Sequence, residues 1–147
     1  EIGVRLVGSE MCIRDSTVFL PFFCEYPYGV YIFPNRHVPY MTDLNEEERF
    51  ALGVTIRDTV AMFDNLFDYQ FPYMMCMHNA PVNTGDYSKD YHFHIEFFPP
   101  MRSADKQKFN ASSETGAWAH CNPRAPEESS EEMRQAYQKM LRKRAEK

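Results

Sequence analysis

The sequence has no long apolar run and no excess of positive charge. None of its apolar stretches approaches the roughly 18–20 residues of a membrane-spanning helix, so we expect no membrane segment. Lysine and arginine total 16 against 21 for aspartate and glutamate, which gives a formal net charge of −5. A mildly acidic chain has no general attraction to nucleic acid or to an anionic membrane surface, so we expect partners of neither kind.

The sequence also lacks the cysteine spacing of a disulfide-stabilised secreted module. Its four cysteines form no Cys-x-x-Cys motif and no short repeated spacing, which favours reduced thiols. They are Cys12, Cys24, Cys76 and Cys121. No charged segment, apolar stretch and small-residue cleavage site occur in the order of a secretory signal. We therefore expect a cytoplasmic protein.

The chain does contain enough apolar material to form a folded domain. It has 147 residues, of which 44% are hydrophobic and 15% aromatic, and this length fits one domain. Residues 1–16 begin with Glu1 rather than methionine, have no clear helix or strand period, and resemble a translated sequencing adapter. We expect residues 1–16 to be a non-native extension and residues 17–147 to be the domain.

The distribution of aromatic, β-branched and turn residues predicts four strands and two helices. The strands are expected over residues 17–24, 29–33, 71–78 and 91–98. Helices are expected over 46–67, where apolar residues recur every three or four positions, and over 126–147, which starts with proline and acidic residues. Residues 79–89 predict a loop, and 101–125 irregular chain with a short helical turn. This order predicts an α+β domain with a largely antiparallel sheet and two main helices.

The most specific local pattern is HFHIE at residues 92–96, in which two imidazoles and a carboxylate alternate with apolar side chains. In a strand these three polar side chains point to one face, about 6.5–7 Å from one to the next. Antiparallel pairing through the 79–89 loop would bring His78 near His92. Three neutral imidazoles suit zinc or iron(II). The residues therefore predict a metal site made by His78, His92 and His94.

Longer stretches carry a resemblance to a known family. Histidines interleaved with apolar residues on a late strand resemble the histidine-triad superfamily, as does IFPNRH at 32–37, which has Asn35 in the place of a lysine. Within that superfamily the sequence is similar to the carboxy-terminal half of the galactose-1-phosphate uridylyltransferases. The similar stretches are PFFCEYPYGVYIFPNRHVPYMTDL, FDNLFDYQFPYMMCMHNAP, YHFHIEFFPPMRSADKQKF and SSETGA. The resemblance covers residues 17–147 and implies a histidine-triad-like fold.

The resemblance also implies an activity. Members of the family are nucleotidyltransferases of galactose metabolism, which move a uridylyl group between UDP-glucose or UDP-galactose and galactose 1-phosphate. Their nucleophile is a histidine in a His-Pro-His-x-Gln motif of the amino-terminal half, and this sequence contains no His-Pro-His. The resemblance therefore implies a carboxy-terminal fragment that has no catalytic residue of its own and is inactive alone. It also implies a homodimer.

Carried over to this sequence, the resemblance assigns roles to eight positions. His78, His92 and His94 correspond to ligands of a structural metal site, whose fourth ligand in the family is a glutamate from the amino-terminal half. The substrate contacts implied are those of Lys108, Phe109, Ser113, Glu114 and His120. Two of these positions depart from many members, which have an aromatic residue at the place of Ser113 and a glutamine near that of His120.

Two other interpretations stay open. The first is a stand-alone histidine-triad nucleotide hydrolase or transferase with His94 as the nucleophile and His92 or Glu96 fixing its tautomer. Glu96 counts against it, because it stands where such enzymes have a third histidine. The second is a non-catalytic interaction domain stabilised by a metal ion.

Overall fold

The computed structural model describes residues 11–13 and 15–146. The elements follow in the order β1 (Met11–Ile13), β2 (Ser16–Phe19), β3 (Val30–Pro34), the 3-10 turn η1 (Met41–Asp43), α1 (Glu46–Asp64), β4 (Met74–His78), β5 (His94–Phe98), β6 (Met101–Ser103), β7 (Lys106–Gln107), α2 (Ser113–Ala117) and α3 (Pro126–Ala145).

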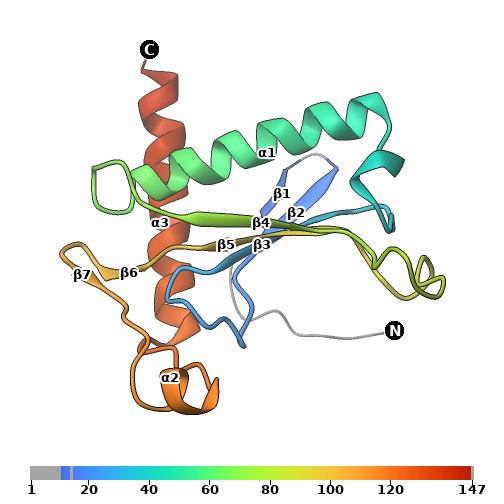
Figure 1. Ribbon diagram of the computed structural model, residues 1–147. Coiled ribbons are helices and arrows are strands. Elements are labelled where there is room, and N and C mark those ends of the chain that lie inside the picture. The colour runs from blue at the N-terminus through green and yellow to red at the C-terminus, as the bar shows by residue number, and fades with distance from the viewer. Residues whose placement is uncertain (1–10, 14, 147) are drawn as a thin grey trace.

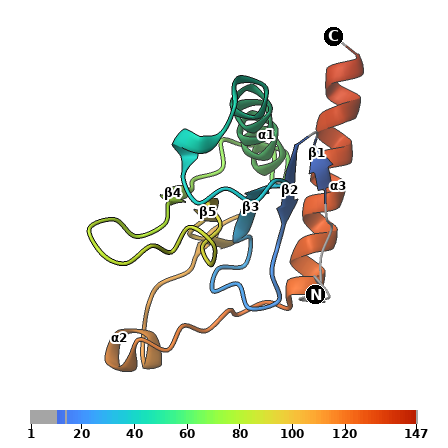
Figure 2. The ribbon, with the colours of Figure 1, turned by 90° about the vertical axis from the view of Figure 1, so that its right-hand side faces the viewer.

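Five of the strands form one antiparallel sheet in the order β1-β2-β3-β5-β4, and β6 pairs with β7 in a separate hairpin. Figure 1 shows α1 lying along one face of the sheet and α2 on the opposite side. Figure 2 shows α3 running past α1 at a steep angle, on the same side of the molecule as β1 and β2. The predicted α+β class, with an antiparallel sheet and two main helices, is confirmed.

Strand alternation gives the sheet two unlike faces. In β5 the side chains of Ile95 and Phe97 are fully buried in the core, whereas those of His94 and Glu96 between them are half-buried on the other face. Burial of a large apolar side chain contributes about 1.5–3 kcal/mol, which fixes the register because a one-residue slip would exchange the two faces. The polar residues of β5 are therefore presented on the face that α1 leaves uncovered.

Three of the four predicted strands are shorter than expected, whereas β3 keeps its predicted length and is shifted by one residue. β2 ends at Phe19, because Pro21 has no amide hydrogen for a ladder and the chain turns there, with the Cys24 amide donating to the Pro21 carbonyl at 3.1 Å. β5 begins only at His94, because the Phe93 amide donates to the carbonyl of Val38 at 2.7 Å. The β6–β7 hairpin was not predicted.

Helix α1 begins where its capping residues predict. Asn45 accepts a hydrogen bond from the Glu48 amide, and the Glu48 carboxylate accepts one from the Asn45 amide, both at 2.9 Å, which completes a capping box. The helix ends at Asp64, three residues before the predicted end, and Asp68 beyond it has a φ of 59°. Within the described chain, no helix combines the length and the apolar character needed to cross a membrane.

The amino-terminal boundary predicted at residue 17 falls within the sheet. Met11–Ile13 pairs antiparallel with Ser16–Val18, and residues 1–10 and 14 lie outside the described residues. A non-native origin of residues 1–16 stays a prediction. At the opposite edge lies β4, four of whose five side chains are exposed.

Candidate metal centre and substrate segment

The β4–β5 hairpin brings His78 opposite His94, as its antiparallel pairing requires. The two imidazole rings are stacked, with centroids 4.9 Å apart and planes 14° from parallel. The carboxylate of Glu96 completes the group, and one ligand atom from each of the three residues lies within 4.8 Å of the others. The cluster thus unites two imidazoles and one carboxylate, all half-buried on the uncovered face of the sheet.

Hydrogen bonding fixes the tautomer of His94. Its Nδ1 lies 2.9 Å from the carbonyl oxygen of His92, which can only accept, so Nδ1 carries the hydrogen. In the neutral ring the Nε2 lone pair then faces the Glu96 carboxylate at 3.0 Å. The Nε2 of His78 is buried 3.8 Å from the same carboxylate, and no described residue forms a hydrogen bond with it. A cation held between these three groups would satisfy all of them, and histidine with carboxylate is a donor set suited to zinc or iron(II).

A tyrosine that the sequence analysis did not select supports this cluster. Tyr31 lies directly opposite Glu96 across β3 and β5, and its hydroxyl shares a hydrogen bond with that carboxylate. Its ring stacks on His94, with centroids 6.0 Å apart. Burial first, and then the charge of Glu96, raises the pKa of Tyr31 above its ordinary value, so the hydroxyl stays protonated and donates. Its alternation with the buried Val30 and Ile32 was the sequence signal that placed it on this face.

His92 does not lie in the cluster of His78, His94 and Glu96. It precedes β5, and its ring contacts Phe33 and His37, with centroid distances of 5.2 and 5.1 Å. Burial, followed by the nearby His37, lowers the pKa of His92, which favours the neutral imidazole that binds metals. Within the described chain its buried Nε2 has no hydrogen-bond partner. Its role as a ligand stays a prediction.

The predicted substrate segment is organised around the carboxylate of Glu114. That side chain is 7% exposed and forms an ion pair with Lys108, which is 4% exposed. The amides of Cys121 and Ala111 donate to its two oxygens at 3.0 and 3.3 Å. The Cys121 amide first, and then Lys108, lower the pKa of Glu114 from 4.5 to about 2. The loop therefore holds an ionised carboxylate in a fixed position.

The other three predicted contacts differ in their surroundings. The Nδ1 of His120 is 3.9 Å from Glu114 and 3.7 Å from Glu25. Ser113 starts α2, and its hydroxyl donates to the Ala119 carbonyl at 3.2 Å. The ring of Phe109 is 75% exposed. The structure thus brings Lys108, Glu114 and His120 together and leaves the Phe109 ring in solvent.

Comparison with solved structures first identifies the fold. A zinc-bound histidine triad family protein from Mycobacterium smegmatis superposes with a TM-score of 0.57 and 15% identity, over 86% of this chain and 81% of that one. At this identity the likeness concerns the fold alone. The fold is that of the histidine-triad proteins, as the histidine-bearing strand predicts.

Closer comparisons then give the family. The family model described as galactose-1-phosphate uridyl transferase, C-terminal domain, matches residues 8–143. The galactose-1-phosphate uridylyltransferase of Thermotoga maritima is 42% identical over 131 residues, which are 87% of this chain and 41% of that protein. A solved uridylyltransferase superposes with a TM-score of 0.79 and 31% identity, over 92% of this chain and 41% of that one. The chain belongs to the galactose-1-phosphate uridylyltransferase family and corresponds to its carboxy-terminal domain.

The chain spans about two fifths of the length of these relatives. The thiols of Cys24, Cys76 and Cys121 are free, as the cysteine spacing predicts.

Proposed function

We propose that this chain is the carboxy-terminal part of a uridylyltransferase that moves a uridylyl group between UDP-glucose or UDP-galactose and galactose 1-phosphate, and that it acts as a homodimer in the cytoplasm. The observation that carries the proposal is the family match over residues 8–143. The nucleophilic histidine would come from the amino-terminal portion that the relatives possess. This chain would supply a structural metal centre and part of the sugar-nucleotide pocket.

The proposed metal centre contains His78, His94 and Glu96. Bound zinc or iron(II) would supply positive charge between a carboxylate and two imidazole nitrogens that face one another. Such an ion would join β4 to β5 at the edge of the sheet, where few side chains are buried. In the family the carboxylate ligand of the metal is a glutamate of the amino-terminal half. Glu96 would instead be a carboxylate ligand supplied by strand β5 of this chain.

The proposed sugar contacts come from the segment between Lys108 and His120. Glu114 is held as an anion by two backbone amides and Lys108, which suits it to accept hydrogen bonds from sugar hydroxyls. Ser113 and His120 lie beside it and would adjust which hydroxyls are recognised. Phe109 is exposed and available to pack against a ligand.

The stand-alone hydrolase with His94 as nucleophile has less support. A nucleophilic nitrogen needs open space for a phosphorus atom and a positive surrounding for the phosphate. The Nε2 of His94 instead faces the Glu96 carboxylate at 3.0 Å, and its Nδ1 is bonded to a carbonyl. A negative group at this position would repel a phosphate.

Metal binding tests the first part of the proposal. Purified chain, stripped of metal and then dialysed against zinc or iron(II), is expected to retain about one ion per chain by elemental analysis. His78→Gln and His94→Gln are expected to lose it, whereas His37→Gln, outside the cluster, retains it. A His92→Gln variant decides whether that residue is also a ligand. Equal retention by the wild-type chain and the His78 and His94 variants would contradict the proposed centre.

Activity tests the second part. The isolated chain is expected to show no uridylyl exchange, and a nucleotidyl adduct trapped on His94 would favour the alternative instead. A chimera in which residues 17–147 replace the matching part of the Thermotoga maritima enzyme is expected to be active. In that chimera Glu114→Gln is expected to lower kcat/KM by about 10–100-fold, the value of a hydrogen bond to a charged group. Glu131→Gln, an exposed carboxylate on α3, serves as the matched control. An inactive but folded chimera would count against the proposed function.

A further inference from the structure

The substrate segment, residues 108–120, has almost no packing of its own. Every residue between Lys108 and Asn122 is exposed except Glu114 and His120, which are half-buried. Figures 1 and 2 both show α2, in the middle of the segment, standing away from the sheet and from α1. A stretch with few buried contacts opens easily unless something outside it holds it in place. The fixed position of the Glu114 carboxylate therefore depends on how the two ends of the segment are held.

Both ends are held by one short stretch of the chain between β2 and β3, residues 24–28, which we call the clamp. At the far end of the segment, the side-chain amide of Asn122 donates to the carbonyl oxygen of Cys24 at 3.0 Å and to its Sγ at 3.2 Å. The same amide lies 3.5 Å from the carbonyl oxygen of Tyr26. The Oδ1 of Asn122 accepts a hydrogen bond from the Arg124 amide at 3.0 Å. Asn122 thus uses both its nitrogen and its oxygen to fasten this end to the clamp.

At the near end of the segment, the ring of Tyr26 holds Lys108. The Nζ of Lys108 lies over this ring, 5.4 Å from its centroid, in a cation–π contact. The same ammonium group forms the ion pair with Glu114. The ring of Tyr26 therefore helps to set where the charged partner of that carboxylate lies.

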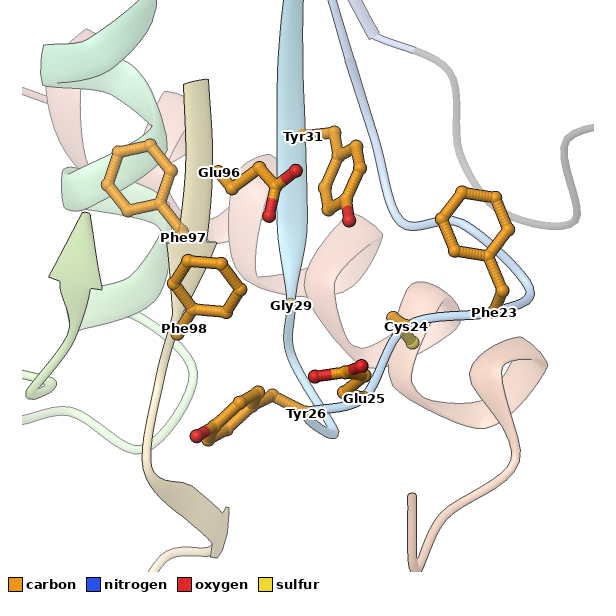
Figure 3. A pocket seen from close by; sticks show the side chains of 9 residues that line it. All are labelled: Phe23, Cys24, Glu25, Tyr26, Gly29, Tyr31, Glu96, Phe97 and Phe98. Atoms are coloured by element: carbon orange, nitrogen blue, oxygen red, sulfur yellow. The ribbon is translucent and has the colours of Figure 1, made fainter. Parts of the chain in front are cut away.

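The clamp is itself firmly placed. The Gly29 amide donates to the Tyr26 carbonyl at 3.0 Å, which closes a turn, and Cys24 and Tyr28 are buried in the core. Figure 3 shows the ring of Tyr26 beside that of Phe98, on which it packs edge-to-face with centroids 5.6 Å apart. Edge-to-face packing restricts the motion of both rings. The exposed substrate segment is therefore fastened to a rigid part of the sheet.

We propose that Asn122 and Tyr26 are positioning residues of the sugar-nucleotide pocket, which together hold the substrate segment where Glu114 and Lys108 meet the ligand. Neither residue would touch the substrate, and the family resemblance assigns no role to either. The inference rests on the proposed function, because it takes Glu114 and Lys108 as substrate contacts. If the segment leaves its place, the apparent affinity falls in proportion to the fraction of molecules that still hold it there.

Order of the segment in the chain itself gives the first test, which needs no activity. The ¹⁵N heteronuclear NOE of residues 109–121 is expected to fall in Asn122→Ala and in Tyr26→Leu, since each variant releases one end. Tyr26→Phe keeps the ring and is expected to keep the wild-type values. Asn122→Asp keeps the shape, removes the donor and serves as a second variant at that position. Circular dichroism checks that each variant is folded, and unchanged NOE values in the folded variants of either residue would overturn the proposal for that residue.

Kinetics of the chimera with the Thermotoga maritima enzyme give the second test. Because neither residue would contact the reacting atoms, Asn122→Ala and Tyr26→Leu are expected to raise KM for UDP-glucose about tenfold and to change kcat by less than about twofold. A tenfold rise corresponds to a segment that is in place in about one molecule in ten. Tyr26→Phe is expected to keep the KM of the chimera.

The two tests separate this inference from the proposed function. A segment that loosens while KM stays constant, or a kcat that falls at constant KM, would overturn the positioning role. A chimera that is inactive with both residues intact would contradict the proposed function instead, and the NOE comparison would still decide whether the clamp holds the segment.

Discussion

The buried hydroxyl of Tyr28 ties the last helix to the core, and its removal gives a quantitative test. Tyr28 is 0% exposed, and its hydroxyl donates to the Glu132 carboxylate at 2.6 Å and accepts a hydrogen bond from Arg124. Arg124 in turn donates two hydrogen bonds to Glu132, at 2.6 and 3.0 Å. This network joins α3 and the chain just before it to the chain that precedes β3.

The effect of Tyr28→Phe follows from these contacts. A hydrogen bond to a charged partner contributes about 1.5–3 kcal/mol to stability. Arg124 and Glu132 stay paired with each other in the variant, so the loss should lie near the lower limit, at about 1.5–2 kcal/mol. For a urea m-value of about 1.5–2 kcal/mol/M, the unfolding midpoint should fall by roughly 1 M.

The assay is equilibrium urea unfolding followed by circular dichroism, with Tyr87→Phe as the matched control. Tyr87 is 44% exposed in the loop between β4 and β5, so loss of its hydroxyl is expected to change the free energy of unfolding by less than about 0.5 kcal/mol. If Tyr28→Phe lowers the free energy of unfolding no more than the control does, the hydrogen-bond network does not stabilise the fold. Apolar packing of Met133 and Met140 would then hold α3 in place.

Three further predictions concern the substrate segment, the first helix and the core. The folded-state pKa of Glu114 is lowered from 4.5 to about 2, so its stabilising effect is full above pH 4.5 and is lost as the pH falls toward 2. The fluorescence anisotropy of Trp118, the only tryptophan, is expected to drop across this window, and a constant value would contradict an anchoring role for the carboxylate. Asn45→Ala removes the capping box of α1 and should cost about 1 kcal/mol in urea unfolding, and a change below about 0.3 kcal/mol would argue against the cap. Phe97→Ala opens a cavity in the core at a fully buried position and should cost about 3–5 kcal/mol by calorimetry, whereas a loss under about 1.5 kcal/mol would mean that the core collapses around it.

The sequence predicts the fold class well because the apolar alternation in β3 and β5 and the apolar period of α1 are strong local signals. It also predicts that His94 and Glu96 share one face, since that follows from the two-residue period of a strand. The predicted ends of the strands are less accurate, because a strand end depends on partners far away in the sequence. One example is the Val38 carbonyl, which accepts a hydrogen bond from the Phe93 amide.

The arrangement of the histidines differs from the expected one, and their role as metal ligands stays a prediction. Pairing across the hairpin was expected to bring His78 near His92, but the register places His78 opposite His94. Tyr31 was missed as a support of Glu96, because cross-strand neighbours are 65 residues apart in the chain and no local pattern joins them. The Glu114 network was reached through family resemblance alone, since loop carboxylates have no periodic signal.

The exposed edge of the sheet at β4 has a consequence for the behaviour of this chain in solution. Its sequence, MMCMH, has neither the lysine nor the proline that usually protects an edge strand, and Met74 and Met77 are 52% and 42% exposed. Backbone groups on that edge are a template onto which another strand can add. The isolated chain should therefore aggregate as its concentration rises, by adding a strand of a second chain to the free edge of β4.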